Sequence, residues 1–186
     1  MKTLIVVAHP NLHESRINKR WLQELEQYSD RLTIHNLYEQ YPDSKLDIAR
    51  EQTLLEQHDR IILQFPLYWF SSPPLLKQWL DEVFLEDWAY GTDIELFHSK
   101  TISVAISAGS RESDYQMDRK YRYDIHHILS PFEVTTRYLN AQYREPFVLY
   151  AAGSHLSDDA LEDSAKRYAE YALQPYADTQ AVQYLH

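Results

Sequence analysis

The chain has 186 residues, of which 44% are hydrophobic and 25% are charged, so it is long enough for one domain with its own core and unlike a disordered or fibrous protein. It contains no cysteine, which excludes disulfides, thiolate catalysis, iron–sulfur clusters and cysteine-based zinc sites. Its 28 acidic and 18 basic residues give a net charge of −10, so we expect no nucleic-acid partner and no anionic membrane surface as a partner.

Glycine is scarce and tyrosine is abundant. The chain has 3 glycines, Gly91, Gly109 and Gly153, against 15 tyrosines, 4 tryptophans and 6 phenylalanines. Neither a G-x-G-x-x-G motif nor a P-loop is present, which excludes two large classes of nucleotide-binding protein. The apolar stretch at 4–8 is far shorter than a membrane span of about 18 residues or a signal peptide, and we therefore expect a cytoplasmic protein.

Short apolar runs alternate with longer amphipathic stretches, which is typical of βαβ units. The first run, at 3–8, is apolar on both faces, as a central parallel strand is. Ser15 and Ser157 are placed to cap helices, Pro74 suits the first turn of another, and Pro131 predicts a bend or split in a fourth. In chain order, we expect a strand at 3–8, a helix at 16–28, a strand at 31–37, a helix at 47–57, a strand at 60–65, a helix at 74–86, a strand at 101–107, a helix at 125–139, a strand at 147–152 and a helix at 158–173.

These five strands and five helices predict a doubly wound α/β fold with a parallel sheet. Residues 1–175 would form the single domain, and residues 176–186 a loosely packed C-terminal tail. Ligands of such sheets bind outside the carboxyl ends of the strands. We therefore expect the chemistry in the loops that follow the first, third and fourth strands.

The loop after the first strand combines polar side chains with the start of a helix. Ser15, Arg16 and Asn18 add a hydroxyl, a cation and an amide to unpaired helical N–H groups that favour an anion. This loop is suited to bind a phosphate without glycine; alternatively, Ser15 is a simple N-cap and Arg16 a solvated charge. His9 and His13 have no third ligand at a metal-binding spacing, so we expect no metal site.

The loop after the third strand carries three consecutive aromatic residues, Tyr68, Trp69 and Phe70. Because successive side chains diverge, the three cannot all face one core. Such a loop is suited to hold a flat ring by stacking and through backbone amides. An aromatic dimer interface is the alternative, and the two interpretations are compatible.

Gly109 follows the fourth strand, where a missing side chain lets the backbone approach a ligand, although for this glycine alone an ordinary turn is the favoured interpretation. Tyr115, Tyr121 and Tyr123, in the polar loop that follows, are either polar handles over a substrate or surface aromatics. His126 and His127 are adjacent on a predicted helix and point about 100° apart. We interpret them as surface or interface residues and not as a chelating pair.

Together these segments resemble one known family. The sequence AHP at 8–10 with S-R-x-N at 15–18, FPLYWF at 65–70 and the helix that follows, to Phe84, are similar to the flavodoxin-like NAD(P)H:quinone oxidoreductases. The segment at 130–152 is similar to their short bacterial branch, which includes general-stress quinone reductases and ancillary subunits of potassium-efflux systems. The resemblance covers roughly residues 1–175 and implies the strand order 2-1-3-4-5 with helices on both faces.

The resemblance also implies a homodimer that binds FMN, or FAD as in the longer animal members, with NAD(P)H as co-substrate. The implied cofactor-binding residues are His9, Ser15, Arg16 and Asn18 at the phosphate, Pro66, Leu67, Tyr68, Trp69 and Phe70 at the isoalloxazine, and Ser107, Ala108 and Gly109 at its other side. Tyr115 would lie near the substrate as the catalytic candidate. The chain departs from the family at Ser110, where a second glycine is usual, and at Ala151 and Ala152, where the bacterial branch has His-Gly; no catalytic histidine is assigned.

The expected activity is two-electron hydride transfer from NAD(P)H through the flavin to a quinone or another flat aromatic acceptor. One shared pocket predicts ping-pong kinetics, and the cofactor carries the chemistry. The alternative is a flavin-binding regulatory subunit of a potassium-efflux or other membrane transport system. A one-electron carrier fits the aromatic loop less well.

Overall fold

The computed structural model describes residues 1–92, 94–153 and 156–175. Its strands are β1 Thr3–Val7, β2 Leu32–Asn36, β3 Arg60–Pro66, β4 Thr101–Ser107, β5 Gln142–Tyr143 and β6 Phe147–Leu149. Its helices are α1 Arg16–Leu25, α2 Leu37–Gln40, α3 Ile48–Glu56, α4 Pro74–Val83, α5 Ile125–Tyr138 and α6 Asp158–Leu173. Short 3-10 turns, η1 to η3, cover Leu12–Glu14, Glu26–Tyr28 and Glu112–Asp114.

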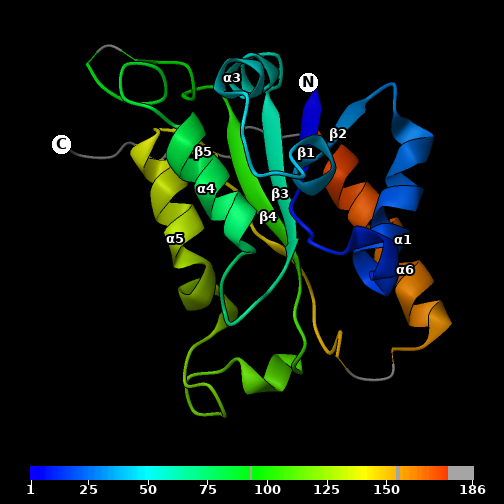
Figure 1. Ribbon diagram of the computed structural model, residues 1–186. Coiled ribbons are helices and arrows are strands. Elements are labelled where there is room, and N and C mark those ends of the chain that lie inside the picture. Colours follow the sequence, from blue (N-terminus) through cyan, green and yellow to red (C-terminus); the bar gives the residue numbers. More distant parts are fainter. Residues whose placement is uncertain (93, 154–155, 176–186) are drawn as a thin grey trace.

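The strands form one parallel sheet between two layers of helices (Figure 1). Its order is β2-β1-β3-β4-β5, and β6 also pairs with β4. Every residue of β1, β3 and β4 is buried, as expected of central strands covered on both faces. The predicted doubly wound fold and its strand order are confirmed.

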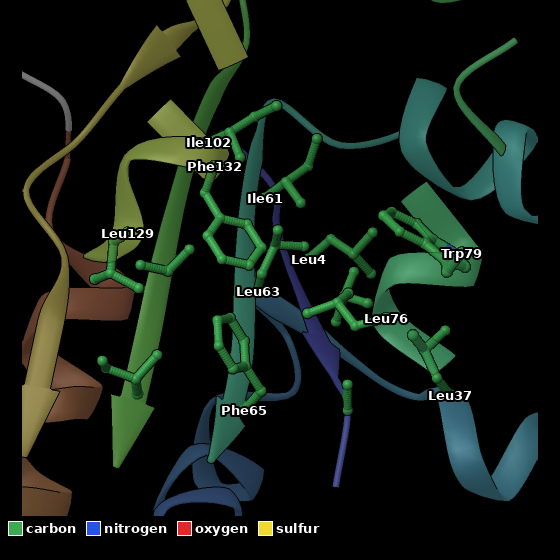
Figure 2. Packing of buried hydrophobic residues seen from close by; sticks show 14 of the residues in the cluster. Leu4, Leu37, Ile61, Leu63, Phe65, Leu76, Trp79, Ile102, Leu129 and Phe132 are labelled. Atoms are coloured by element: carbon green, nitrogen blue, oxygen red, sulfur yellow. The ribbon is translucent and has the colours of Figure 1, made fainter. Parts of the chain in front are cut away.

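Each face of the sheet has its own apolar core. On one face, α1 and α6 cover the sheet, with Trp21 and Tyr168 among the buried residues. On the other face, α3, α4 and α5 cover it, and Figure 2 shows Phe65 of β3 facing Phe132 of α5, with ring centroids 5.2 Å apart. Because helices pack on both faces of the sheet, the ends of the central strands are firmly positioned. Such strand ends suit a site built on the loops that follow them.

The single strand expected at 147–152 is wrong in its bounds. The edge of the sheet holds two short strands, β5 and β6, which pair with successive parts of β4. Between Ile102 and Ala105, β4 advances by 3 residues while the edge segment advances by 4, from 143 to 147. This bulge contains Pro146, which has no N–H for the ladder, so the strand is interrupted there.

Pro131 does not split its helix, because α5 is continuous from Ile125 to Tyr138. The missing N–H of a proline leaves the carbonyl four residues earlier without its usual partner. Here the hydroxyl of Ser130 donates to that carbonyl, on His127, at 2.7 Å. The expected split is therefore wrong, and the neighbouring serine gives the physical reason.

The loops after β1, β3 and β4 leave the sheet at the same end, the lower one in Figure 1. This common edge is where the sequence predicts the chemistry. No helix in the described part of the chain has both the length and the apolar character needed to cross a bilayer. Residues 176–186, predicted to form a tail, lie outside the described residues.

Candidate functional site

Backbone hydrogen bonds join the loops at the carboxyl edge of the sheet. Ala8 donates to the carbonyl of Gln64 at 2.9 Å, and Leu67 donates to the carbonyl of Ser107 at 3.0 Å. The ladder continues where Ala108 donates to the carbonyl of Leu149 at 2.8 Å. The predicted phosphate, aromatic and Gly109 segments therefore begin side by side on one rigid edge.

The first loop presents a capped helix start and a neutral histidine. Ser15 is the N-cap of α1, and its hydroxyl accepts from the N–H of Asn18 at 3.1 Å. The Nδ1 atom of His9 accepts from the N–H of Asn11 at 3.1 Å, and burial lowers the pKa of the His9 ring. A neutral ring whose Nδ1 is an acceptor carries its proton on Nε2, so His9 has one N–H donor left for a ligand.

Asn18 lies inside the fold and links three elements. It is 1% exposed, and its Nδ2 donates to the hydroxyl of Ser107 at 3.0 Å. Its Oδ1 accepts from Nε2 of Gln64, itself fully buried, at 3.2 Å. The amide predicted to touch a phosphate therefore ties α1 to β3 and β4. Sequence reasoning missed Gln64, although a polar residue in the apolar run of β3 is a usable signal.

Arg16 is directed toward α6. Its guanidinium donates to the carbonyl of Leu156 at 2.6 Å and to the carboxylate of Asp158 at 2.5 Å. Asp158 lies in the first turn of α6, so the pair joins the starts of α1 and α6. In this arrangement Arg16 is the ion-pair partner of Asp158.

The aromatic loop forms a tight and strained hairpin. Tyr68 and Ser71 exchange both backbone hydrogen bonds, each at 2.9 Å, around Trp69 and Phe70, whose φ angles are 49° and 62°. Two-residue turns with both φ values positive normally use Asn and Gly. A bulky residue in the left-handed region costs roughly 1–2 kcal/mol.

The aromatic loop is also exposed. Trp69 is 94% exposed and Phe70 44%, so in the isolated chain burial does not offset the strain at Trp69. Strained residues of this kind concentrate at ligand-binding sites. The predicted aromatic loop thus presents two rings outward at the carboxyl end of β3.

Gly109 provides open backbone beside this loop. A side chain at Gly109 would meet no atom within 4 Å, so the space in front of it is free. Behind it lies the segment after β6, where Gly153 donates to the carbonyl of Gly109 at 3.2 Å and a Cβ at Gly153 would lie 3.2 Å from that oxygen. The sequence alone did not place Gly153 at the site, although the chain has only 3 glycines and each is a candidate for a close approach of two backbone segments.

A row of aromatic rings closes the side of the site next to Gly109. Tyr121 packs edge-to-face against Phe70 at 4.9 Å between centroids, and Tyr115 lies 5.1 Å from Tyr121 and 5.6 Å from Tyr150. Tyr115, the predicted catalytic residue, is only 6% exposed, and burial raises the pKa of its hydroxyl. Tyr121 therefore stands between Tyr115 and the aromatic loop.

A cavity of about 540 Å³ opens on the β2 side of the first loop. Its walls include His9, Pro10 and Lys19 on one side and Asn36, Tyr38 and Glu39 on the other. This volume lies in the range typical of small-molecule sites. Within the described residues, no group of three or more histidine or carboxylate side chains is placed to hold a metal ion.

Comparison with known proteins agrees with this geometry. The model of a family described as having a flavodoxin-like fold matches residues 1–172. The chain belongs to this flavodoxin-like family. An uncharacterized NAD(P)H oxidoreductase of Bacillus subtilis, YrkL, is 45% identical over 171 residues, which are 92% of this chain and 97% of that protein.

Solved structures and a transport-system protein are also similar. General stress protein 14 of Treponema denticola, solved in complex with FMN, is 44% identical with a TM-score of 0.87, and the match covers 94% of this chain and 100% of that one. An NADPH-quinone reductase from P. pentosaceus is 32% identical with a TM-score of 0.84, over 92% and 98% of the two chains. The glutathione-regulated potassium-efflux system ancillary protein KefG of Enterobacter sp. (strain 638) is 38% identical over 174 residues, 94% of each chain.

Proposed function

We propose that this flavodoxin-like protein is an FMN-dependent NAD(P)H:quinone oxidoreductase. The observation that carries the proposal is the strained, exposed turn of Trp69 and Phe70, which stands beside open backbone at Gly109. A flat aromatic ligand compensates such strain by covering the two rings. The similar FMN complex and the similar NADPH-quinone reductase support flavin and quinone as the ligands.

The residues of the first loop fit a phosphate group. The start of α1 is the positive end of a helix dipole, capped by Ser15 and flanked by the Nε2–H of His9. Asn18 holds this start against Ser107 and is a positioning residue in this proposal. Arg16 is paired with Asp158. Its main part in phosphate binding is to hold the start of α1 in place, and its positive charge attracts the phosphate from a distance.

When bound, FMN supplies the two-electron redox centre between NAD(P)H and the acceptor. The chain's own part is to bind and orient. Trp69 and Phe70 stack on flat rings, the backbone at Gly109 allows close approach, and the tyrosine row of Tyr115, Tyr121 and Tyr150 excludes water from one side. NAD(P)H and the acceptor would use the same flat slot in turn, which is a ping-pong scheme.

The experiment that tests this function is steady-state turnover of the purified, FMN-loaded protein with NAD(P)H and menadione. Ping-pong exchange predicts parallel lines in double-reciprocal plots at several quinone concentrations, with FAD tested in place of FMN as a comparison. Intersecting lines would contradict the shared slot. Absence of turnover with bound FMN would contradict the oxidoreductase activity itself.

A second candidate function rests on the similarity to the potassium-efflux ancillary protein. The chain would then bind flavin and act mainly as a regulatory subunit of a membrane transport system. The same assay separates the two functions, because a regulatory subunit binds FMN with little turnover of its own.

We also propose a homodimer. Val134 and Tyr138, one turn apart on α5, are 63% and 65% exposed, and the ring of Tyr138 lies 5.3 Å from that of Tyr90. Large exposed apolar side chains that gather on one face are typical of protein interfaces. Sedimentation at micromolar concentration should give a dimer mass, and Val134→Asp should give a monomer.

A further inference from the structure

Arg60 is a buried arginine at the amino end of β3, on the edge of the sheet opposite the proposed flavin site. Its exposed fraction is 0%. Its Nη1 atom donates to the carbonyl of Ala172 at 3.1 Å and to that of Gln174 at 3.4 Å, at the end of α6. The Nε and Nη2 atoms, on another edge of the planar guanidinium, make no hydrogen bond of good geometry to a described residue. One pair of parallel N–H donors on this buried side chain is therefore left open.

Three buried hydroxyl groups near Arg60 are in the same condition. Arg60 is the register partner of Thr101 in β4, and Ser103 follows two residues later on the same face of the sheet. Tyr168 of α6 is close enough for the charge of Arg60 to oppose the rise that burial causes in the pKa of its hydroxyl. The hydroxyls of Thr101, Ser103 and Tyr168 make no hydrogen bond of good geometry to a described residue, and these residues are at most 6% exposed. Because buried polar groups are normally hydrogen-bonded, this concentration of open donors points to a ligand.

The charge of Arg60 also has no carboxylate partner among the described residues, since its hydrogen bonds go to carbonyl groups only. The guanidinium carbon lies 4.9 Å from the ring centroid of Tyr171, which is a cation–π contact. Burial and then the nearby guanidinium of Arg144 lower the pKa of Arg60, and only tyrosines oppose them. An arginine keeps its charge near neutral pH all the same. A side-on pair of N–H donors with a positive charge matches the geometry of a carboxylate or a phosphate.

We propose that Arg60 and the hydroxyls of Thr101, Ser103 and Tyr168 bind a small oxyanion between α6 and the amino ends of β3 and β4. The Nε and Nη2 atoms of Arg60 would hold two oxygens, and the hydroxyls would donate to the oxygens as well. The net charge of −10 repels anions in general, so binding needs a local charge that the fold leaves unneutralised, and Arg60 supplies it. This inference does not rest on the proposed function.

The test is thermal unfolding of the full chain, saturated with FMN, as inorganic phosphate replaces sodium chloride at constant ionic strength. An anion that binds only the folded state raises the unfolding temperature with its concentration. Arg60→Met removes the charge, Arg60→Lys keeps the charge without the paired donors, and Tyr168→Phe removes one hydroxyl and keeps the ring. The two Arg60 variants should bind phosphate at least about tenfold more weakly than wild type, and Tyr168→Phe should bind it more weakly in part.

Arg31→Gln is the matched control, because Arg31 is exposed and donates to the carbonyl of Leu173 at 3.4 Å, near the same end of α6. It removes one positive charge from this region and should respond to phosphate as wild type does. A phosphate effect of equal size in wild type and both Arg60 variants would be an adventitious ion only and would overturn the site. An effect that Arg31→Gln abolishes would place the anion on the surface and would overturn it too.

The oxyanion has two possible sources, the solution and the chain itself. Asp178, in the segment outside the described residues, offers a carboxylate of the same chemistry. A wild type that phosphate stabilises through Arg60 indicates a free anion. If Asp178 is the source, phosphate should stabilise Asp178→Asn and not wild type, and Arg60→Met should abolish that gain. No response to phosphate in wild type or in Asp178→Asn would overturn the proposal.

Discussion

The first loop and the aromatic loop follow neighbouring strands, yet they are built in opposite ways. In the first loop, Ser15 and Asn18 are tied to the chain's own N–H and hydroxyl groups, and Asn18 is buried. In the aromatic loop, Trp69 and Phe70 are exposed and their backbone is strained. In the proposed site, buried polar residues such as Asn18 therefore form the frame that holds the loops in place, while the exposed and strained residues Trp69 and Phe70 are the ones proposed to contact the ligand.

A change remote from both loops should cost the most stability without affecting ligand binding. The carboxylate of Glu51 is fully buried and accepts from Tyr41, from Nε1 of Trp79 at 2.8 Å and from Nε2 of His35 at 2.8 Å. Glu51→Gln disrupts this set and should lower the free energy of unfolding by about 3 kcal/mol. Urea denaturation measures the loss, with the exposed Glu26→Gln as control, and FMN affinity should stay unchanged once the variant is folded.

The same carboxylate predicts a pH dependence. Burial opposes its ionisation, but the hydrogen bonds from His35 and Tyr41 outweigh burial, so the pKa of Glu51 lies below its usual value. A lowered folded-state pKa contributes stability that is complete above the unfolded-state pKa and is lost as pH falls through the folded-state value. The stability gap between wild type and Glu51→Gln should therefore narrow in acid, and a gap that widens would contradict this assignment.

The frame residue Asn18 should affect stability and binding together. Asn18→Leu removes the bonds to Ser107 and Gln64 and leaves buried polar groups unpaired, at a cost of about 2–3 kcal/mol. It should also weaken FMN binding, because the start of α1 is no longer fixed. Asn11→Ala, an exposed change in the same loop, should alter neither quantity, and an Asn18 variant of normal stability would contradict the frame role.

The aromatic loop should respond in the opposite direction. Trp69→Asn with Phe70→Gly creates the Asn-Gly pair that this turn prefers, and the relief of strain at both positions, reduced by the lost contact of Phe70 with Tyr121, should raise the free energy of unfolding by about 1–2 kcal/mol. The same double variant should lose most of its affinity for FMN, because both stacking rings are gone. Thermal unfolding and an FMN titration measure the two effects, and a less stable variant would contradict the strain argument.

The smallest effect is expected at Arg16. Its pair with Asp158 is largely exposed, with side chains 49% and 92% accessible, and such pairs contribute about 0–1 kcal/mol. Arg16→Met should reduce FMN affinity less than tenfold, which corresponds to about 1.4 kcal/mol. A larger loss of affinity, measured by the same titration, would restore Arg16 as a direct phosphate ligand.

The central part of the fold follows from the sequence, because β1, β3 and β4 are apolar runs whose two faces both need cover. The edge of the sheet at β5 and β6 is harder to predict from the sequence, since the bulge at Pro146 depends on the register in which these two strands pair with β4. The site shows the same division. Residue types predict its three loops, but the internal bonds of Asn18 and the pairing of Arg16 depend on contacts between elements distant in the chain. The left-handed turn is local, between Tyr68 and Ser71, but it does not follow from the sequence because Trp69 and Phe70 are not the residues that such a turn normally uses.

The most direct test of the account is an anaerobic absorbance titration of the FMN-loaded protein, first with NAD(P)H and then with menadione. The account predicts that the yellow colour is lost on the first addition and restored by the second, and that the Trp69→Asn, Phe70→Gly variant is colourless after gel filtration. A wild-type protein that retains no FMN, or whose bound FMN ignores NAD(P)H, would contradict the central claim.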